Sequence, residues 1–283
     1  MNKNKWIVFG SALLLTAILY AASEKQFFGI QKNKKPQSSL IAQSQFSTDS
    51  VLFYAKTHLS ADQITRINYL EHSISRGDVT DQQLHIFHQL AIFWGDSIKS
   101  FPPYAWYTAE SARLENSEKS LTFAAHLFLN GLVEENDAQV KQWEAFQAKD
   151  LFERSLKLNP NNDSSKVGLG EVYLYGGIAM PMQGISLLKE VVAKDSNNIY
   201  AQMSLGRASL MSNQIEKAVE HFKKVVSLQP NNIEAIFRIA EIAEQLGNKR
   251  EAIEWYTKLL PLTNGAEIRK DIETRIADLN NNQ

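Results

Sequence analysis

The chain has 283 residues, of which 30 are Lys or Arg and 31 are Asp or Glu, so its formal net charge at pH 7 is −1. This balance, together with the absence of a basic stripe interleaved with aromatic residues, argues against a nucleic-acid-binding protein. The sequence contains no cysteine, which excludes disulfides, thiol catalysis, cysteine-based zinc sites and lipid attachment through an N-terminal cysteine.

The first predicted element is an apolar helix near the N-terminus. Residues 1–5 form a short basic head, and residues 6–22, WIVFGSALLLTAILYAA, carry no charge. As an α-helix this run would extend about 25 Å, close to the lower limit for crossing a bilayer. We therefore predict a single-pass membrane anchor from Trp6 to Ala22, with the rest of the chain on the extracytoplasmic (periplasmic) side. The alternative is a signal peptide that is cleaved near Ala22 and releases the chain.

A linker and a group of helices follow this run. Residues 23–45 include KNKKPQSS and few periodic apolar positions, so we predict a flexible linker. Residues 46–119 show helical periodicity, beginning with a helix at Ser47–His58. Pro102 and Pro103 interrupt the region.

Two capping boxes mark helix starts within residues 46–119. Ser60 is followed by Gln63, and Thr80 by Gln83, so that each pair can satisfy the free N–H groups of a first turn. The helices that follow have apolar stripes made of Ile64, Ile67, Leu70 and Ile74, and of Leu84, Phe87, Ala91, Trp94 and Ile98.

A 34-residue stretch, Ile199 to Asn232, contains two amphipathic helices separated by a short turn at Asn213 and Gln214. Pro230 ends the second helix, because proline cannot continue it. A helix pair of this size cannot bury its apolar faces alone, so it requires neighbours of the same kind.

This stretch resembles a tetratricopeptide repeat (TPR). Small residues lie where the two helices of such a repeat cross closely, and an aromatic residue fills the space between repeats. The matching residues are Leu205, Gly206, Ala218, Phe222 and Pro230 in this unit, Ala240, Ala252 and Tyr256 in the next, Gly170 and Gly184 in the one before, and Ala125, Ala148, Phe152 and Pro160 one unit earlier.

The resemblance implies an all-α TPR helix-turn-helix solenoid of about four to five repeats, the first two degenerate. Residues 46–119 would hold a degenerate repeat, residues 120–265 the remaining repeats, and residues 266–283 a capping helix and tail. In that last helix, Ile268, Ile272, Ile276 and Leu279 are expected to form one apolar stripe. With the anchor at its N-terminus, the whole chain resembles membrane-anchored bacterial TPR proteins.

No catalytic or cofactor site is predicted. His85 and His88 are three residues apart on a helix, but no third metal ligand lies nearby in the sequence. No glycine-rich phosphate loop follows a strand, and no carboxylate pair stands out as an acid–base couple. We therefore predict a protein that is not an enzyme, with no metal and no cofactor.

In TPR proteins the first helix of each unit lines a concave face, and the resemblance implies which side chains point into it. The groove residues expected on this basis are Val167, Glu171, Leu174 and Tyr175, then Tyr200, Met203, Arg207 and Met211, then Phe237, Glu241 and Glu244. This set suits a partner peptide or helix with apolar anchors and some positive charge.

The stretch Gly176–Gly184, GGIAMPMQG, replaces the tight turn of an ordinary repeat. Pro181 is expected to start the next helix, with Ile178, Met180 and Met182 packed against neighbouring helices. The alternative is that this stretch forms a contact loop.

The predicted function is a noncatalytic scaffold that holds a partner protein near a membrane. One alternative is an assembly factor of the cytochrome c maturation type, whose TPR domain binds an apoprotein peptide. Another is a structural protein that self-associates through its end helices. The partner itself is not named by the sequence.

Overall fold

The computed structural model describes residues 47–74 and 80–281. The chain divides into two units, Met1–Gln45 and Phe46–Gln283, and all described residues belong to the second. The predicted anchor Trp6–Ala22 and the predicted linker 23–45 lie outside the described residues. Among the helices that are described, none combines the length and the apolar character that a membrane span requires.

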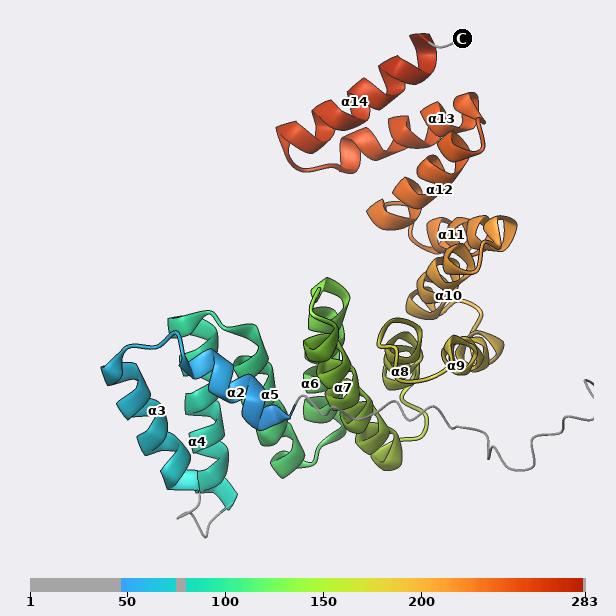
Figure 1. Cartoon of the computed structure of the whole chain (residues 1–283). Helices are drawn as coiled ribbons and strands as arrows, with labels where there is room; N and C mark the ends of the chain where they lie inside the picture. The colour runs from blue at the N-terminus through green and yellow to red at the C-terminus, as the bar shows by residue number, and fades with distance from the viewer. Residues whose placement is uncertain (1–46, 75–79, 282–283) are drawn as a thin grey trace, which may run out of the picture. The chain divides into compact units, whose positions relative to one another are not determined.

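The described residues are entirely helical, with 13 α-helices, two short irregular helices and no strand (Figure 1). This confirms the predicted all-α, TPR-like solenoid for this part of the chain. The helices are α2 (Thr48–Lys56), α3 (Ala61–Ile74), α4 (Thr80–Ile92), α5 (Phe101–Glu115), α6 (Glu118–Glu134), α7 (Ala138–Leu158), α8 (Asp163–Tyr175), α9 (Pro181–Lys194), α10 (Ile199–Met211), α11 (Ile215–Leu228), α12 (Ile233–Gln245), α13 (Lys249–Leu259) and α14 (Ala266–Asn281).

Serine side chains cap the starts of α2 and α3, and of the two predicted capping boxes the one at Ser60–Gln63 is confirmed. Ser47 caps α2 by accepting a hydrogen bond from the N–H of Ser50. The capping box before α3 is present: the backbone N–H of Ser60 donates to Oε1 of Gln63 at 2.9 Å, and the N–H of Gln63 donates to Oγ of Ser60 at 3.3 Å.

The helix predicted to run from Thr80 to Ile98 changes its geometry partway. The segment η1 (Phe93–Ile98) is a π-helical turn that ends at Lys99, which has a left-handed backbone with φ of 58°. The buried Trp94 lies within it. Pro102 and Pro103 then occupy the first turn of α5, where the missing proline N–H costs no hydrogen bond.

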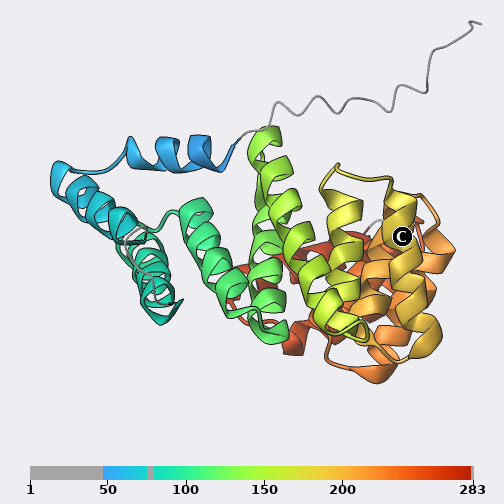
Figure 2. The same cartoon turned by 90° about the horizontal axis from the view of Figure 1, so that it is seen from below.

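From α6 onward the helices form four successive hairpins, α6–α7, α8–α9, α10–α11 and α12–α13. Small residues allow the two helices of a hairpin to approach, as predicted. A Cβ atom on Gly206 would lie 2.5 Å from the ring of Phe222, and one on Gly184 would lie 2.3 Å from the carbonyl oxygen of Gly170. Figure 2 shows the same hairpins turned by 90°.

Three hairpins begin with the same asparagine cap. The side-chain oxygens of Asn162, Asn198 and Asn232 accept the N–H of the residue three positions later, at 2.8, 2.9 and 3.0 Å. Each cap satisfies one of the free donors that every helix start presents.

The last helix, α14, covers the end of the α12–α13 hairpin. Ile272 is buried, with Ile276 and Leu279 packed beside it. The expectation that Ile268 joins this stripe is wrong. It lies in the first turn of α14, close to the exposed turn at Gly265, and 56% of its surface remains exposed.

The turn between α8 and α9 also differs from the prediction. Pro181 starts α9 and Ile178 packs against the core, both as expected. Met180 and Met182, however, are 67% and 63% exposed, so the expectation that they pack against neighbouring helices is wrong. They flank the helix start, where the neighbouring hairpins provide no surface to cover them.

Candidate functional site

A groove of ≈ 680 Å³ runs along the first helices of the four hairpins, α6, α8, α10 and α12. It is called the groove from here on. Its lining residues are Leu129, Asn130, Val133 and Glu134 of α6, Glu171 and Tyr175 of α8, Arg207, Leu210 and Met211 of α10, and Glu234 and Arg238 of α12. The four helices follow one another in this order in Figure 1.

The centre of the groove holds a network of paired charges. Arg207 donates from Nε and Nη2 to the two carboxylate oxygens of Glu234, at 2.8 and 2.6 Å, and from Nη1 to Oε1 of Glu171 at 3.1 Å. Such a two-pronged arginine–carboxylate pair is among the stronger hydrogen-bonded contacts in proteins. Arg207 is therefore satisfied within the chain.

Glu171 is only 5% exposed, and hydroxyl groups complete its hydrogen bonds. The Tyr200 hydroxyl donates to its Oε2 at 2.6 Å and the Ser204 hydroxyl donates to its Oε1 at 2.7 Å. Burial and the nearby Glu171 carboxylate raise the pKa of Tyr200 above its ordinary range. The same two causes raise the pKa of Tyr175 to about 12, so this phenol stays protonated near neutral pH.

Apolar side chains remain exposed in the groove. Val133 on α6 is 58% exposed and Met211 on α10 is 57% exposed. Leu210 and the ring of Tyr175 lie partly buried between them. Together they offer an apolar surface around the paired charges.

Two ends of the groove carry charges that are not fully paired within the described residues. Glu134 is exposed, and its carboxylate takes part in no ion pair or hydrogen bond there. Arg238 donates from Nη1 to Glu241 at 2.9 Å, while its Nε is buried without a partner in that part of the chain.

The structure places four of the predicted groove residues in the groove: Glu171, Tyr175, Arg207 and Met211. Three others are inside the helix packing. Val167, Leu174 and Met203 are 0%, 7% and 5% exposed, so they present almost no surface to a partner.

The remaining predicted groove residues make contacts within the chain. The Tyr200 hydroxyl donates a hydrogen bond to Glu171, and Phe237 packs on Tyr256 with ring centroids 6.4 Å apart. Glu241 pairs with Arg238, and Glu244 accepts hydrogen bonds from Tyr256 and from Arg275 of α14. The capping helix therefore occupies the surface that Glu244 was expected to offer.

Sequence reasoning missed the α6 wall of the groove. Applying the repeat numbering one unit earlier, with Ala125 at the eighth position, puts Leu129 and Asn130 at positions twelve and thirteen, which Leu210 and Met211 occupy in the Ile199 unit, where both line the groove. The long α6–α7 hairpin, with helices of 17 and 21 residues, obscured this correspondence.

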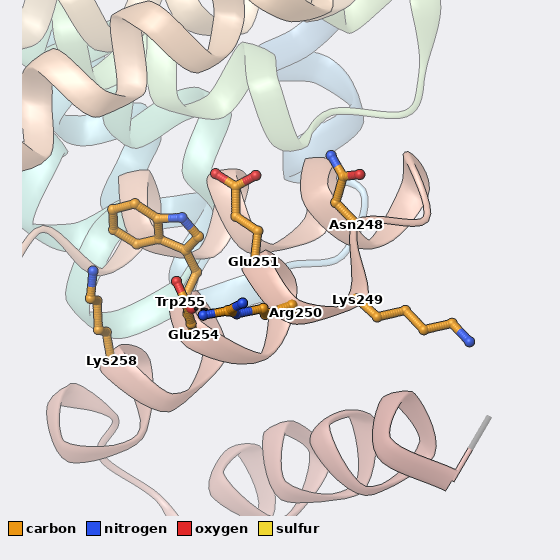
Figure 3. Close-up of a pocket in the computed structure, with 7 residues that line it drawn as sticks. All are labelled: Asn248, Lys249, Arg250, Glu251, Glu254, Trp255 and Lys258. Carbon is orange, nitrogen blue, oxygen red and sulfur yellow. Dashed lines mark ion pairs between the residues drawn. The ribbon is translucent and has the colours of Figure 1, made fainter. Parts of the chain in front are cut away.

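A second hollow lies on α13 and is lined by Asn248, Lys249, Arg250, Glu251, Glu254, Trp255 and Lys258 (Figure 3). The ammonium of Lys258 lies 4.0 Å from the ring centroid of Trp255, and Arg250 pairs with Glu254 at 3.5 Å. Its charges are of both signs, and Lys249 extends away from the other side chains in Figure 3.

The histidines weighed as metal ligands have other partners. His85 is hydrogen bonded to Gln89 at 2.7 Å, and His88 to the Ser111 hydroxyl at 2.7 Å. Within residues 47–74 and 80–281, no group of three histidine, cysteine or carboxylate side chains is placed to hold a metal ion.

Comparison with known proteins gives one family match. Residues 210–270 match the tetratricopeptide repeat family, which confirms the predicted repeats for this part of the chain. Among curated proteins, cellulose synthase operon protein C of Pseudomonas fluorescens (strain SBW25) is 24% identical over 140 residues, covering 50% of this chain but only 11% of that protein.

Solved structures with a similar arrangement include MamA (residue 41 to its end) from Desulfovibrio magneticus RS-1, which is 24% identical in sequence with a TM-score of 0.46. The matched region covers 66% of this chain and 96% of the MamA chain. Another is TTC0263, a thermophilic TPR protein in Thermus thermophilus, which is 16% identical with a TM-score of 0.48 and covers 71% and 98% of the two chains.

Proposed function

We propose that this chain is a noncatalytic protein–protein interaction module that holds a peptide or helix of a partner protein in the groove. TPR proteins bind protein or peptide partners and are generally noncatalytic scaffolds, and the family match at residues 210–270 supports this class. The observation that carries the proposal is the groove itself, where Val133 and Met211 remain more than half exposed among the first helices of four hairpins.

The chemistry of the groove fits such a partner. Exposed apolar side chains on helices lining a groove are what an amphipathic helix or an extended segment buries on binding. Methionine is flexible and polarizable, so Met211 can adapt to the shape of an incoming side chain. The central arginine is already bonded to two carboxylates, so a partner does not need to neutralise it, and this group keeps one net negative charge.

The proposal includes a location near a membrane, with Trp6–Ala22 as a single-pass anchor and residues 46–283 on the periplasmic side. The uncharged run and its length support the anchor. Membrane fractionation followed by protease treatment of intact and opened spheroplasts tests this. Protection of residues 46–283 from protease in intact spheroplasts would contradict the periplasmic orientation. A chain found free of membranes would indicate cleavage of the N-terminal segment.

The groove is tested by comparing two methionine substitutions. Met211→Glu places a charge on the apolar surface of the groove, while Met182→Glu introduces the same change at a site of similar exposure (63% against 57%) outside it. Because both side chains are largely exposed, both variants should fold. We expect Met211→Glu to lose proteins that co-purify with the gently extracted full-length chain, by roughly tenfold or more.

The readout is quantitative mass spectrometry of the co-purified proteins, with circular dichroism to check folding of both variants. Partners lost with Met182→Glu and kept with Met211→Glu would move the binding site to the start of α9. Partners kept by both folded variants would refute the groove as the binding site.

A further inference from the structure

We propose that the groove selects the direction of its partner segment by charge. A basic side chain of the partner lies beside Glu134 at the α6 end, an acidic side chain lies beside Arg238 at the α12 end, and apolar side chains between them cover Val133 and Met211. This inference rests on the proposed function and specifies the partner for the same groove.

The middle of the groove holds one arginine between two carboxylates, so it carries one net negative charge. Arg207 is hydrogen bonded to both Glu171 and Glu234, through three of its nitrogen atoms. Glu171 also accepts the hydroxyls of Tyr200 and Ser204. An acidic partner residue is therefore disfavoured at this point, and a basic one would find both carboxylates already bonded to Arg207.

The α6 end differs because its carboxylate has no partner within the described residues. The carboxylate of Glu134 is exposed and has no hydrogen bond or ion pair within the described residues. Glu135 follows it directly, with Oε1 accepting the N–H groups of Asn136 and Asp137. A lysine or arginine of a partner would find an unpaired carboxylate here.

The α12 end has guanidinium N–H donors that are not used within the described residues. Arg238 uses Nη1 for Glu241, at 2.9 Å, and its side chain is 41% exposed. Its Nε is buried, so the donors left for a partner are those of Nη2, which makes no hydrogen bond within the described residues. An aspartate or glutamate of a partner would complete this contact.

The two ends are separated along the line of helices. α8 packs against both α6 and α10, and α12 belongs to the next hairpin, so Glu134 and Arg238 lie on opposite walls with α8 and α10 between them. Tyr175 lies on α8 between them, and its hydroxyl has no hydrogen-bond partner within the described residues. It is available to donate to a partner carbonyl group in either direction, whereas the two charged ends favour one direction.

The experiment uses a displayed library of random linear peptides as the probe, selected on the folded chain in low salt. Peptides that Met211→Glu no longer binds are kept as groove binders. Each is then synthesised in two forms, the selected sequence and a sequence in which its basic and acidic residues are exchanged. Affinities of both forms are measured for the native chain and for the double variant Glu134→Arg with Arg238→Glu.

We expect the native chain to prefer the selected form by roughly threefold to tenfold, as partly exposed charge pairs allow. The double variant should prefer the exchanged form by a similar factor, and added salt should reduce both preferences. The control pair, Glu220→Arg with Lys189→Glu, alters exposed charges of α11 and α9 outside the groove and should keep the native preference.

Replacing Arg238 removes its ion pair with Glu241, which could lower the melting temperature of the double variant. In that case Glu134→Arg alone tests the α6 end, since Glu134 has no hydrogen bond or ion pair to lose within the described residues. Groove binders whose preference is unchanged by these variants would overturn the inference while leaving the proposed function standing. The absence of any peptide that depends on Met211 would overturn both.

Discussion

At the scale of single residues, Glu144 on α7 stands apart from the other carboxylates. It is 1% exposed, and its Oε2 atom has no hydrogen-bond partner within the described residues. Burial is the main cause that raises its pKa to about 8, with the Glu135 carboxylate adding to the effect and Lys141 opposing it. The folded chain therefore keeps a proton on Glu144 at neutral pH.

This proton makes stability depend on pH. Since the pKa of Glu144 rises on folding from 4.5 to about 8, its contribution is fully present at low pH and is lost as the pH rises through that window. We expect the free energy of unfolding to fall by on the order of a few kcal/mol between about pH 5 and about pH 9. Glu144→Gln, which cannot ionise, should flatten this decline.

Urea unfolding curves of the native chain and of Glu144→Gln at several pH values make the comparison. Parallel declines in the two proteins would show that Glu144 is not responsible.

At the scale of an element pair, α8 and α9 bring their backbones into unusually close approach. A Cβ atom on Gly184 would lie 2.3 Å from the carbonyl oxygen of Gly170, and backbone cannot move aside as a flexible side chain can. We expect Gly184→Ala to destabilise the chain by about 3 kcal/mol, because the two helices must separate.

The stability of Gly184→Ala is measured by chemical denaturation, with Gly247→Ala as its matched control. Its added Cβ would meet nothing within 4 Å, and its cost comes only from the positive φ of 75°, about 1 kcal/mol. If Gly184→Ala proved no more costly than Gly247→Ala, the close packing of α8 on α9 would not be a determinant of stability.

The same scale shows how far a sequence predicts these elements. The Ser60–Gln63 cap, the small residues at Gly206 and Gly184 and the start of α9 at Pro181 were predicted because each follows from local chemistry. The π-helical turn at Phe93–Ile98 was not predicted, since Trp94 and Ile98 fit the apolar spacing of an α-helix and a π turn differs from it in hydrogen-bond register. The exposure of Met180 and Met182 depends on where other hairpins lie.

At the scale of the whole described unit, the hairpins stabilise one another only through neighbours. α14 contacts the final hairpin, where Ile272 is 4% exposed beside Tyr256 and Leu259. In such an array the stability is approximately a sum of each unit and its interfaces. Damage to α14 should therefore spread into α12–α13 and fade toward α6–α7.

Ile272→Ala tests this with Ile268→Ala as its control on the same helix. We expect a cost of about 2–4 kcal/mol for the buried residue, and a change within about 0.5 kcal/mol for the exposed one. Hydrogen exchange measured by mass spectrometry should show the lost protection in α12–α14. Equal loss throughout α6–α9 would mean that the unit unfolds as a single block.

The candidate groove was predictable in part at this same scale. Glu171, Tyr175, Arg207 and Met211, which the repeat numbering selects, line the groove, because position within a repeat fixes which way a side chain points. The repeat numbering could not tell that Val167 and Met203 are buried, because the exposure of a side chain depends on the residues of the next hairpin. The groove residues of α6 were not predicted, because the α6–α7 hairpin is longer than the other repeats.

The asparagine caps carry a consequence for how such a chain can change its length. Asn198 and Asn232 make the same cap, and each is followed by an isoleucine that begins a helix. Removing residues 199–232 would join Asn198 to Ile233 and recreate the same junction without any new loop. Duplicating that stretch would do so as well. A change of length by one whole hairpin therefore requires no new junction, and the groove would lengthen or shorten by one helix each time.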